Sequence, residues 1–178
     1  MRAQVHVHGT LSLCKGVARG QIEAALEPWL EYLDVDSLDE AKSVEPNEPG
    51  IVFDERSRTL DICWSGDVGR SFHPLLEEAL HALGRYTEYA AEVEVSLYYD
   101  SGDEETRFVF VGPSPEAIHE AQRRRMAEDI SSLLSRHFDQ NAADEVVALV
   151  NELFARDWTA KSGQAEAARE NSPSPQVV

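Results

Sequence analysis

Two closely spaced histidines are the first residues in this sequence that could do chemistry. His6 and His8 are one residue apart, and a β-strand would place both on one face, roughly 6.6 Å apart. Two imidazoles at this spacing can share a metal ion, but a site needs a third and a fourth ligand. Cys63 or Asp61 could supply one if their strand is a neighbour. Because nothing completes the set, we favour two solvent-facing histidines and predict no metal and no other cofactor.

Other arrangements of reactive residues are incomplete. His73, Glu77 and His81 share a helix face but lack the Glu inside the pair that a zinc protease needs. The segment 34–45 has the length of a calcium loop, but leucine and aspartate stand where that loop needs an oxygen ligand and a glycine. Phosphate-binding and nucleophile-elbow motifs are also missing. We therefore predict no catalytic residues, and the sequence favours a non-enzymatic protein while an enzymatic function stays open.

The least generic feature of the sequence is the position of its negative charge. The 178 residues include 33 Asp and Glu against 16 Lys and Arg, which gives a net charge of −17. Eleven acidic residues and one base lie between Glu23 and Glu55, and six acidic residues and no base lie between Glu92 and Glu105. Such charge repels phosphate backbones and anionic lipids, so we expect no direct nucleic-acid binding and no membrane binding.

The concentration of negative charge in these two stretches leaves two interpretations open. One is solubility, and the other is binding to a basic protein surface. Our leading hypothesis is a non-enzymatic inhibitor or nucleic-acid mimic that occupies a basic surface of a partner, as phage-type anti-defence proteins do. The acidic residues expected at this surface are Glu23, Glu27, Glu31, Asp34, Asp36, Asp39, Glu40, Glu92, Glu94, Asp103, Glu104 and Glu105.

Two further hypotheses come from other parts of the chain. One is a small metal-binding protein or enzyme that uses a polar sheet face with His6 and His8. The other is a structural or assembly protein that pairs its C-terminal helices between subunits. The same apolar residues can instead form intrachain core, which we favour, so the chain is expected to be a monomer or a homodimer. No apolar run approaches the roughly 20 residues of a membrane span, and the first nine residues lack the apolar core of a signal peptide. We therefore expect a cytoplasmic protein with free Cys14 and Cys63.

Strands and helices must position all of these residues. Alternating apolar residues predict strands over 5–13, 51–53, 60–64, 93–99 and 108–111, with a turn over 66–69. Helical spacing predicts helices over 22–33 with an interruption at Pro28, over 75–83, over 115–138 and over 140–158.

The order of these elements predicts an α+β fold. It is β-α-β-β-α-β-β followed by two C-terminal helices, which gives an antiparallel sheet of about five strands with helices packed on one face. The first six elements have the order of a ferredoxin-like split βαβ unit. We expect a single domain over 1–158 and a disordered C-terminal tail over 159–178, where apolar content falls.

Overall fold

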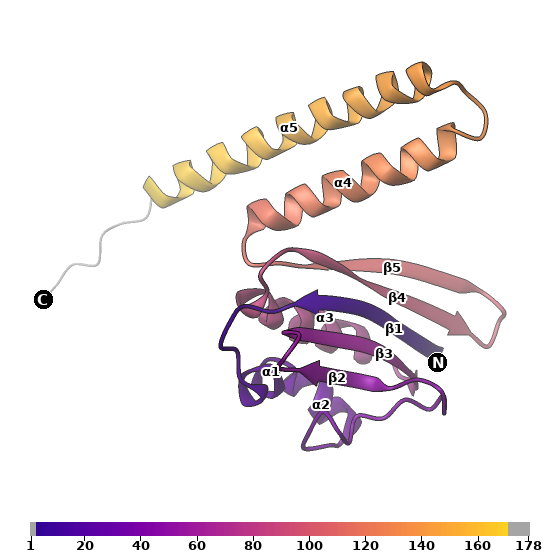
Figure 1. Cartoon of the computed structure of the whole chain (residues 1–178), viewed down its shortest axis with the longest axis vertical. Helices are drawn as coiled ribbons and strands as arrows, with labels where there is room; N and C mark the ends of the chain where they lie inside the picture. Colours follow the sequence, from indigo (N-terminus) through magenta and orange to yellow (C-terminus); the bar gives the residue numbers. More distant parts are fainter. Residues whose placement is uncertain (1–2, 171–178) are drawn as a thin grey trace, which may run out of the picture. The chain divides into compact units, whose positions relative to one another are not determined.

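The computed structural model describes the backbone of residues 3–170 and the side chains of residues 3–161 (Figure 1). The contacts divide the chain into two compact units, the sheet unit up to Ala121 and the helical unit from Gln122. The predicted single domain over 1–158 spans both units. Along the chain the elements are β1 (Ala3–Ser12), α1 (Arg19–Ala25), α2 (Glu27–Leu33), β2 (Gly50–Asp54), β3 (Thr59–Val68), α3 (Phe72–Leu83), the 3-10 helix η1 (Gly84–Tyr86), β4 (Ala91–Tyr99), β5 (Glu104–Val111), α4 (Pro115–Leu134) and α5 (Gln140–Glu170).

The sheet unit is built on one open antiparallel sheet with the strand order β2-β3-β1-β4-β5. β1 is the central strand, in which Val5 pairs with Gly66 of β3 on one side and with Leu97 of β4 on the other. β2 and β5 are edge strands, and each pairs antiparallel with its neighbour. The predicted α+β class and the antiparallel sheet of five strands are confirmed.

The alternation of residue types separates the two faces of this sheet. In β1 the side chains of Val5, Val7 and Leu11 are fully buried. The residues that alternate with them, His6, His8, Thr10 and Ser12, are exposed or half-buried. Helices α1, α2 and α3 cover the buried face and share one apolar core with it (Figure 1). The opposite face carries the polar side chains of the strands, as expected when only one face of a sheet is covered.

Three aromatic side chains join the helices to the buried face. The rings of Trp29 and Trp64 pack edge to face at 5.5 Å, and Phe72 stacks on Trp64 at 5.7 Å. Such pairs add about 0.5–1.5 kcal/mol beyond the burial of their surface. A Cβ at Gly66 would overlap the ring of Trp64, so glycine leaves the space that the indole fills. β3 continues through Gly66, where the sequence predicts the start of a turn.

The first predicted helix is divided into α1 and α2. Leu26 ends α1 and precedes α2, with φ −87° and ψ 3°. Pro28 lies in the first turn of α2, where its missing N–H has no partner to lose. The predicted interruption at Pro28 is therefore confirmed. Because of this interruption, Glu23 lies on α1 and Glu27 lies on α2, in two separate short helices.

The helical unit contains α4 from Gln122 onward and all of α5. Arg123 on α4 donates a hydrogen bond to the side-chain oxygen of Asn151 on α5. Among residues 122–161 only Ala143 is fully buried, and Leu149 and Leu153 are 52% and 50% exposed. Within the described residues, Val146 of α5 is also exposed, whereas Val147, Val150, Phe154 and Trp158 are half-buried. No described helix combines the length and the apolar composition that crossing a membrane requires.

Helix α5 is longer than the sequence predicts. We expect a disordered tail from residue 159 onward, but α5 continues to Glu170. The residues of this last part are mainly Ala, Gln, Glu, Arg and Lys, which are strong helix formers even without an apolar face. Low apolar content was thus a poor guide to the end of the helix. The rest of the predicted tail, 171–178, lies outside the described residues.

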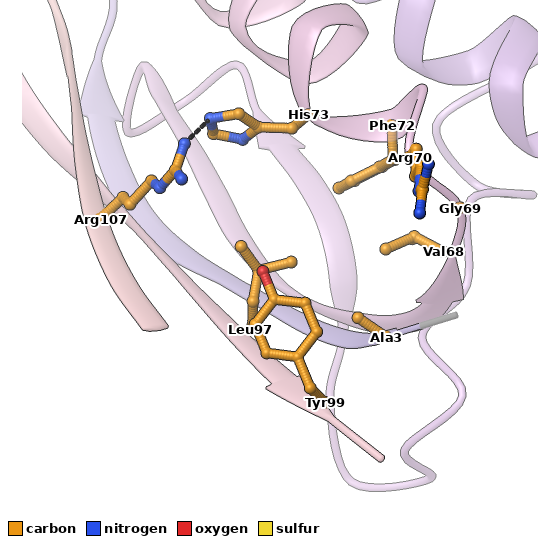
Figure 2. Close-up of a pocket in the computed structure, with 9 residues that line it drawn as sticks. All are labelled: Ala3, Val68, Gly69, Arg70, Phe72, His73, Leu97, Tyr99 and Arg107. Carbon is orange, nitrogen blue, oxygen red and sulfur yellow. Dashed lines mark hydrogen bonds between the residues drawn. The ribbon is translucent and has the colours of Figure 1, made fainter. Parts of the chain in front are cut away.

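The helices leave one part of the buried sheet face uncovered. A hollow opens between the first turn of α3 and the ends of β1, β3 and β4 (Figure 2). Its floor is formed by Ala3, Val68 and Leu97, which lie on the core side of their strands.

Candidate functional site

The two histidines of β1 lie together on the polar face of the sheet. Their rings are stacked, with centroids 6.1 Å apart and planes inclined by 17°. His8 is exposed and His6 is half-buried. Their neighbours across the strands are Ser65 for His6 and Cys63 for His8, because β1 pairs with β3. The predicted shared face of His6 and His8 is therefore present, and Cys63 comes from an adjacent strand.

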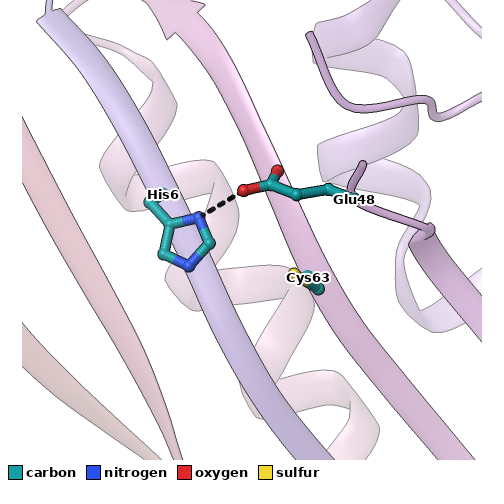
Figure 3. Close-up of side chains that lie close together, drawn as sticks. All are labelled: His6, Glu48 and Cys63. Carbon is teal, nitrogen blue, oxygen red and sulfur yellow. Dashed lines mark ion pairs between the residues drawn. The ribbon is translucent and has the colours of Figure 1, made fainter. Parts of the chain in front are cut away.

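His6 and Cys63 meet a third side chain that the sequence analysis did not identify. One ligating atom each from His6, Glu48 and Cys63 lies within 4.8 Å of the other two (Figure 3). Glu48 comes from the loop between α2 and β2. Asp61, the other ligand considered from the sequence, instead accepts a hydrogen bond from Thr10 at 2.7 Å. We call His6, Glu48 and Cys63 the His–Glu–Cys cluster.

Serine hydroxyls and an imidazole hold the carboxylate of Glu48 in place. Ser43 donates to Oε2, Ser65 donates to Oε1 at 3.1 Å, and Nδ1 of His6 lies 3.1 Å from Oε1. Burial alone would raise the pKa of Glu48, but the hydrogen bonds from Ser43 and Ser65 and the neighbouring imidazole of His6 lower it overall. Glu48 is therefore a carboxylate at neutral pH.

The loop that carries Glu48 is fixed to β3 through its backbone. The backbone N–H of Ser65 donates to Oγ of Ser43 at 2.9 Å, and the N–H of Val44 donates to the carbonyl of Ser65 at 2.9 Å. A residue without any sequence motif thus reaches the polar face because its loop is bonded to the edge of β3. In the sequence, only Ser43 and Ser65, the two serines that bond to Glu48, could have pointed to this position, and two separate serines are a weak indication.

The thiol of Cys63 is protonated in the metal-free protein. Burial raises its pKa, and the negative charge of Glu48 raises it further. A cysteine nucleophile needs the opposite shift, so the environment does not favour Cys63 as a catalytic nucleophile. The imidazole, carboxylate and thiolate groups of this cluster are instead the ligand types that zinc takes in proteins.

The remaining predicted ligand sets do not assemble. Nε2 of His73 lies 3.3 Å from Oε1 of Glu77, but His81 does not join them in a group with metal-binding geometry. Over the part of the chain that the structure describes, the His–Glu–Cys cluster is the only group of three or more such residues close enough to share an ion.

The acidic residues predicted to bind a partner lie in two parts of the sheet unit. Those of the first stretch are on α1, on α2 and in the loop leading to edge strand β2, and those of the second are on β4, in the β4–β5 turn and on edge strand β5. The first set is Glu23, Glu27, Glu31, Asp34, Asp36, Asp39 and Glu40, and the second is Glu92, Glu94, Asp103, Glu104 and Glu105.

Several of these carboxylates have partners inside the protein. Arg19 bonds to Glu23 at 3.0 Å and to Asp39 at 2.7 Å. Glu105 accepts from Arg107 at 2.7 Å, and this hydrogen bond is the main reason why the pKa of Glu105 is lowered. Glu40 accepts from the backbone N–H of Asp36. These residues serve local structure and are less available to a partner.

Three exposed carboxylates on α2 and at its C-terminal cap have no such role. Glu27, Glu31 and Asp34 are exposed, and their side chains make no hydrogen bond or ion pair among the described residues. Glu31 lies in the last turn of α2, and Asp34 caps that helix in a left-handed conformation with φ 57°. Negative groups are unfavourable at the negative C-terminal end of a helix. We call these three residues the α2 acidic group.

Fold and site together define an acidic α+β protein with one polar sheet face and a His–Glu–Cys cluster. Residues 3–155 match a family of unknown function, DUF6806, and the chain therefore belongs to that family. Neither the curated proteins nor the solved structures that were compared gave a match.

Proposed function

We propose that this protein binds another protein through the α2 acidic group and the loop that follows it. The observation that carries the proposal is the position of Glu31 and Asp34, which are exposed at the negative end of α2 without a described counterion. A helix adapted only for stability would carry Lys or Arg there. The unfavourable placement is explained if cations of a partner neutralise these carboxylates on binding.

A partner with a basic, nucleic-acid-holding surface fits this charge best. Spaced carboxylates can stand in for phosphates and steer a cationic surface toward the complex. In this proposal the protein is an inhibitor or nucleic-acid mimic, for example of the phage-type anti-defence kind, and does not contact nucleic acid itself. We further propose a cytoplasmic location, with which the free Cys14 and Cys63 are consistent.

Affinity capture with charge-neutralised variants tests this proposal. The full chain is immobilised and exposed to cell extract at low salt, as wild type and as the triple variant Glu27→Gln/Glu31→Gln/Asp34→Asn. A matched triple variant, Glu128→Gln/Glu145→Gln/Glu152→Gln, removes the same charge from exposed sites on α4 and α5.

We expect a protein that the wild type and the matched control capture and that the α2 triple variant does not. The complex should dissociate at high salt and in the presence of nucleic acid that binds the partner. Equal capture by both triple variants, or capture that salt does not affect, would refute a role for the α2 acidic group.

A second function, metal binding, is favoured by the His–Glu–Cys cluster. The cluster combines nitrogen, oxygen and sulfur ligands within 4.8 Å, and a fourth position on the polar face can be taken by water or by a substrate. Nδ1 of His6 contacts Glu48, and a carboxylate in this position is also known to orient a metal-binding histidine. Elemental analysis of protein purified without a histidine tag checks this function, since a stoichiometric divalent metal supports it and its absence after zinc loading contradicts it.

We also propose that β1 to β4 and their helices form a ferredoxin-like unit to which β5 is added. β1 lies between β3 and β4, so the connection from β1 to β2 and the connection from β3 to β4 each skip one strand and carry helices. This arrangement supports a split βαβ unit. An experimental structure compared with proteins of that fold would test the assignment.

A further inference from the structure

The hollow beside α3 has an apolar floor and a cationic rim. Its volume is about 300 Å³. Ala3, Val68 and Leu97 form the floor, and the aromatic rings of Phe72 and Tyr99 form two of its sides (Figure 2). The charged side chains that line it are Arg70, from the connection between β3 and α3, and Arg107, from β5. Apolar walls with a few polar groups are typical of small-molecule sites.

One of the two arginines is held by neighbouring side chains. Arg107 donates from Nε and Nη2 to Glu105 and from Nη1 to Nε2 of His73 at 2.9 Å. A guanidinium group can only donate, so Nε2 of His73 must be the acceptor and the ring proton is on Nδ1. Nδ1 is buried and has no hydrogen-bond partner. Glu77, 3.3 Å from Nε2, adds a second carboxylate to this side of the hollow. Arg107 is therefore largely neutralised and fixed in position.

Arg70 has no counterion among the described residues. It forms no ion pair or side-chain hydrogen bond with any described residue, although the chain carries a net charge of −17. It stands next to the first turn of α3, where Ser71 makes no side-chain capping bond. The backbone N–H of Phe72 is bonded to the carbonyl of Gly69, and Pro74 has no N–H, so the attraction for an anion at this rim comes from Arg70.

We infer that this pocket binds a small organic anion with an apolar body. The apolar floor excludes a strongly hydrated ion such as free phosphate, and the unpaired Arg70 selects a ligand with one negative group over a neutral one of the same shape. The pocket lies on the buried side of the sheet, whereas the His–Glu–Cys cluster lies on the polar side. The two sites therefore take ligands of opposite charge on opposite faces.

Two matched fluorescent probes test this inference. The probes are 8-anilinonaphthalene-1-sulfonate and N-phenyl-1-naphthylamine, which share both aromatic groups and differ by the sulfonate. They are titrated into the full-length protein as wild type, Arg70→Gln, Arg85→Gln and Ala3→Leu. Arg85 is exposed in η1 at the other end of α3 and controls for a change of overall charge. Ala3→Leu fills the floor, and circular dichroism confirms that each variant is folded.

We expect the sulfonate probe to bind the wild type at one site, and Arg70→Gln to weaken it about tenfold while changing the neutral probe by less than about twofold. Arg85→Gln should leave both probes unchanged, and Ala3→Leu should remove binding of both. The inference is overturned if the neutral probe binds the wild type as tightly as the sulfonate. It is equally overturned if Arg85→Gln and Arg70→Gln have the same effect, or if Ala3→Leu leaves both affinities intact.

Discussion

Cys63 is the residue on which the metal hypothesis depends most. Its raised pKa keeps the thiol protonated in the metal-free protein, because burial and Glu48 both disfavour the thiolate. A bound zinc ion would reverse this preference, since a coordinating thiol loses its proton. Binding therefore releases protons, and zinc affinity should increase with pH.

The two free cysteines give a matched pair for this hypothesis. We expect Cys63→Ser to weaken zinc binding by at least about tenfold, because a hydroxyl replaces a soft ligand. Cys14→Ser should bind zinc like the wild type, since its Sγ only donates to the carbonyl of Thr87 at 3.3 Å. Calorimetric titration of reduced, tag-free protein with zinc chloride measures both. Equal affinities in the two variants would show that the cluster is not the zinc site.

Glu48 gives the second prediction at the residue scale. Its pKa is lowered below the ordinary value of 4.5, so its contribution to stability is present above that value and is lost as the pH falls through the lowered pKa. We expect Glu48→Gln to lower the free energy of unfolding at pH 7 by about 1–2 kcal/mol, because the bonds from Ser43 and Ser65 weaken. The difference between variant and wild type should shrink as the pH decreases below 4.5.

Urea unfolding across a pH series measures this difference. Asp144→Asn, an exposed change on α5, serves as the control and should give a small, nearly constant difference. A Glu48→Gln difference that stays the same from neutral to acidic pH would contradict the assigned role of the carboxylate.

The sequence predicted part of this cluster and not the rest. His6 and His8 share a strand face because the strand period is two, and Cys63 was a candidate because it lies on a polar strand face. The position of Glu48 could not be predicted in this way. It belongs to a loop without periodicity, and only the hydrogen bonds of that loop to β3 bring the carboxylate to His6.

At the scale of elements, the contact between Trp64 and Gly66 determines how β3 lies under the helices. Both residues are on the buried face, and the indole lies where a side chain at Gly66 would be. The same ring contacts Trp29 and Phe72, so it connects two helices to the sheet. A displacement of Trp64 would therefore affect both helices.

We predict that Gly66→Ala lowers the free energy of unfolding by about 1–3 kcal/mol, because the added methyl group displaces the indole. The control is Gly20→Ala in α1, where a Cβ would meet nothing within 4 Å and should be neutral or stabilising by up to about 1 kcal/mol. Chemical denaturation measures both variants. If Gly66→Ala is as stable as Gly20→Ala, the packing argument for β3 is wrong.

Helix α2 should show a conflict between stability and binding. Glu31→Gln removes a negative charge from the C-terminal turn and should raise stability by about 0.3–1 kcal/mol, whereas Glu27→Gln in the first turn should lower it by a similar amount. Both changes should weaken capture of the partner proposed above. Denaturation curves of the two variants at low ionic strength check the opposite signs.

The order of elements was predictable because it depends on local patterns. Apolar residues repeat every second residue in β1 and at helical spacing in α3, and both patterns depend on nearby residues only. The order of the strands in the sheet could not be predicted from local patterns, because the pairing of β1 with β3 and β4 depends on contacts between distant segments. The end of α5 was misjudged because its last part consists mainly of strong helix formers, which continue a helix without an apolar pattern.

At the scale of the whole molecule, the two units differ in what they expose. The sheet unit carries the exposed carboxylates of the α2 acidic group, and the helical unit exposes apolar side chains along α5. Clustered apolar exposure often marks a surface that another protein chain covers. Our assembly hypothesis assigns that surface to a second copy of this chain.

The assembly hypothesis predicts that light scattering at high protein concentration gives the mass of a homodimer. The variant Leu149→Glu/Leu153→Glu should give the monomer mass of 19.8 kDa, because charged groups replace side chains that are about half exposed. The control Glu145→Gln/Glu152→Gln changes neighbouring positions of the same helix and should remain dimeric. A monomeric wild type at all concentrations would eliminate the assembly hypothesis.

The loop that carries Glu48 is also bonded to a buried tryptophan, so tryptophan fluorescence can be used to study the His–Glu–Cys cluster. Nε1 of Trp64 donates to the carbonyl of Lys42 at 3.0 Å, while the next residue, Ser43, bonds to Glu48. A ligand or proton that moves the side chain of Glu48 should therefore change the polarity around the buried indole of Trp64. Trp29, whose Nε1 has no hydrogen-bond partner, lacks this connection. We therefore expect the emission of Trp64, measured beside that of Trp29 and Trp158, to respond to events on the opposite face of the sheet.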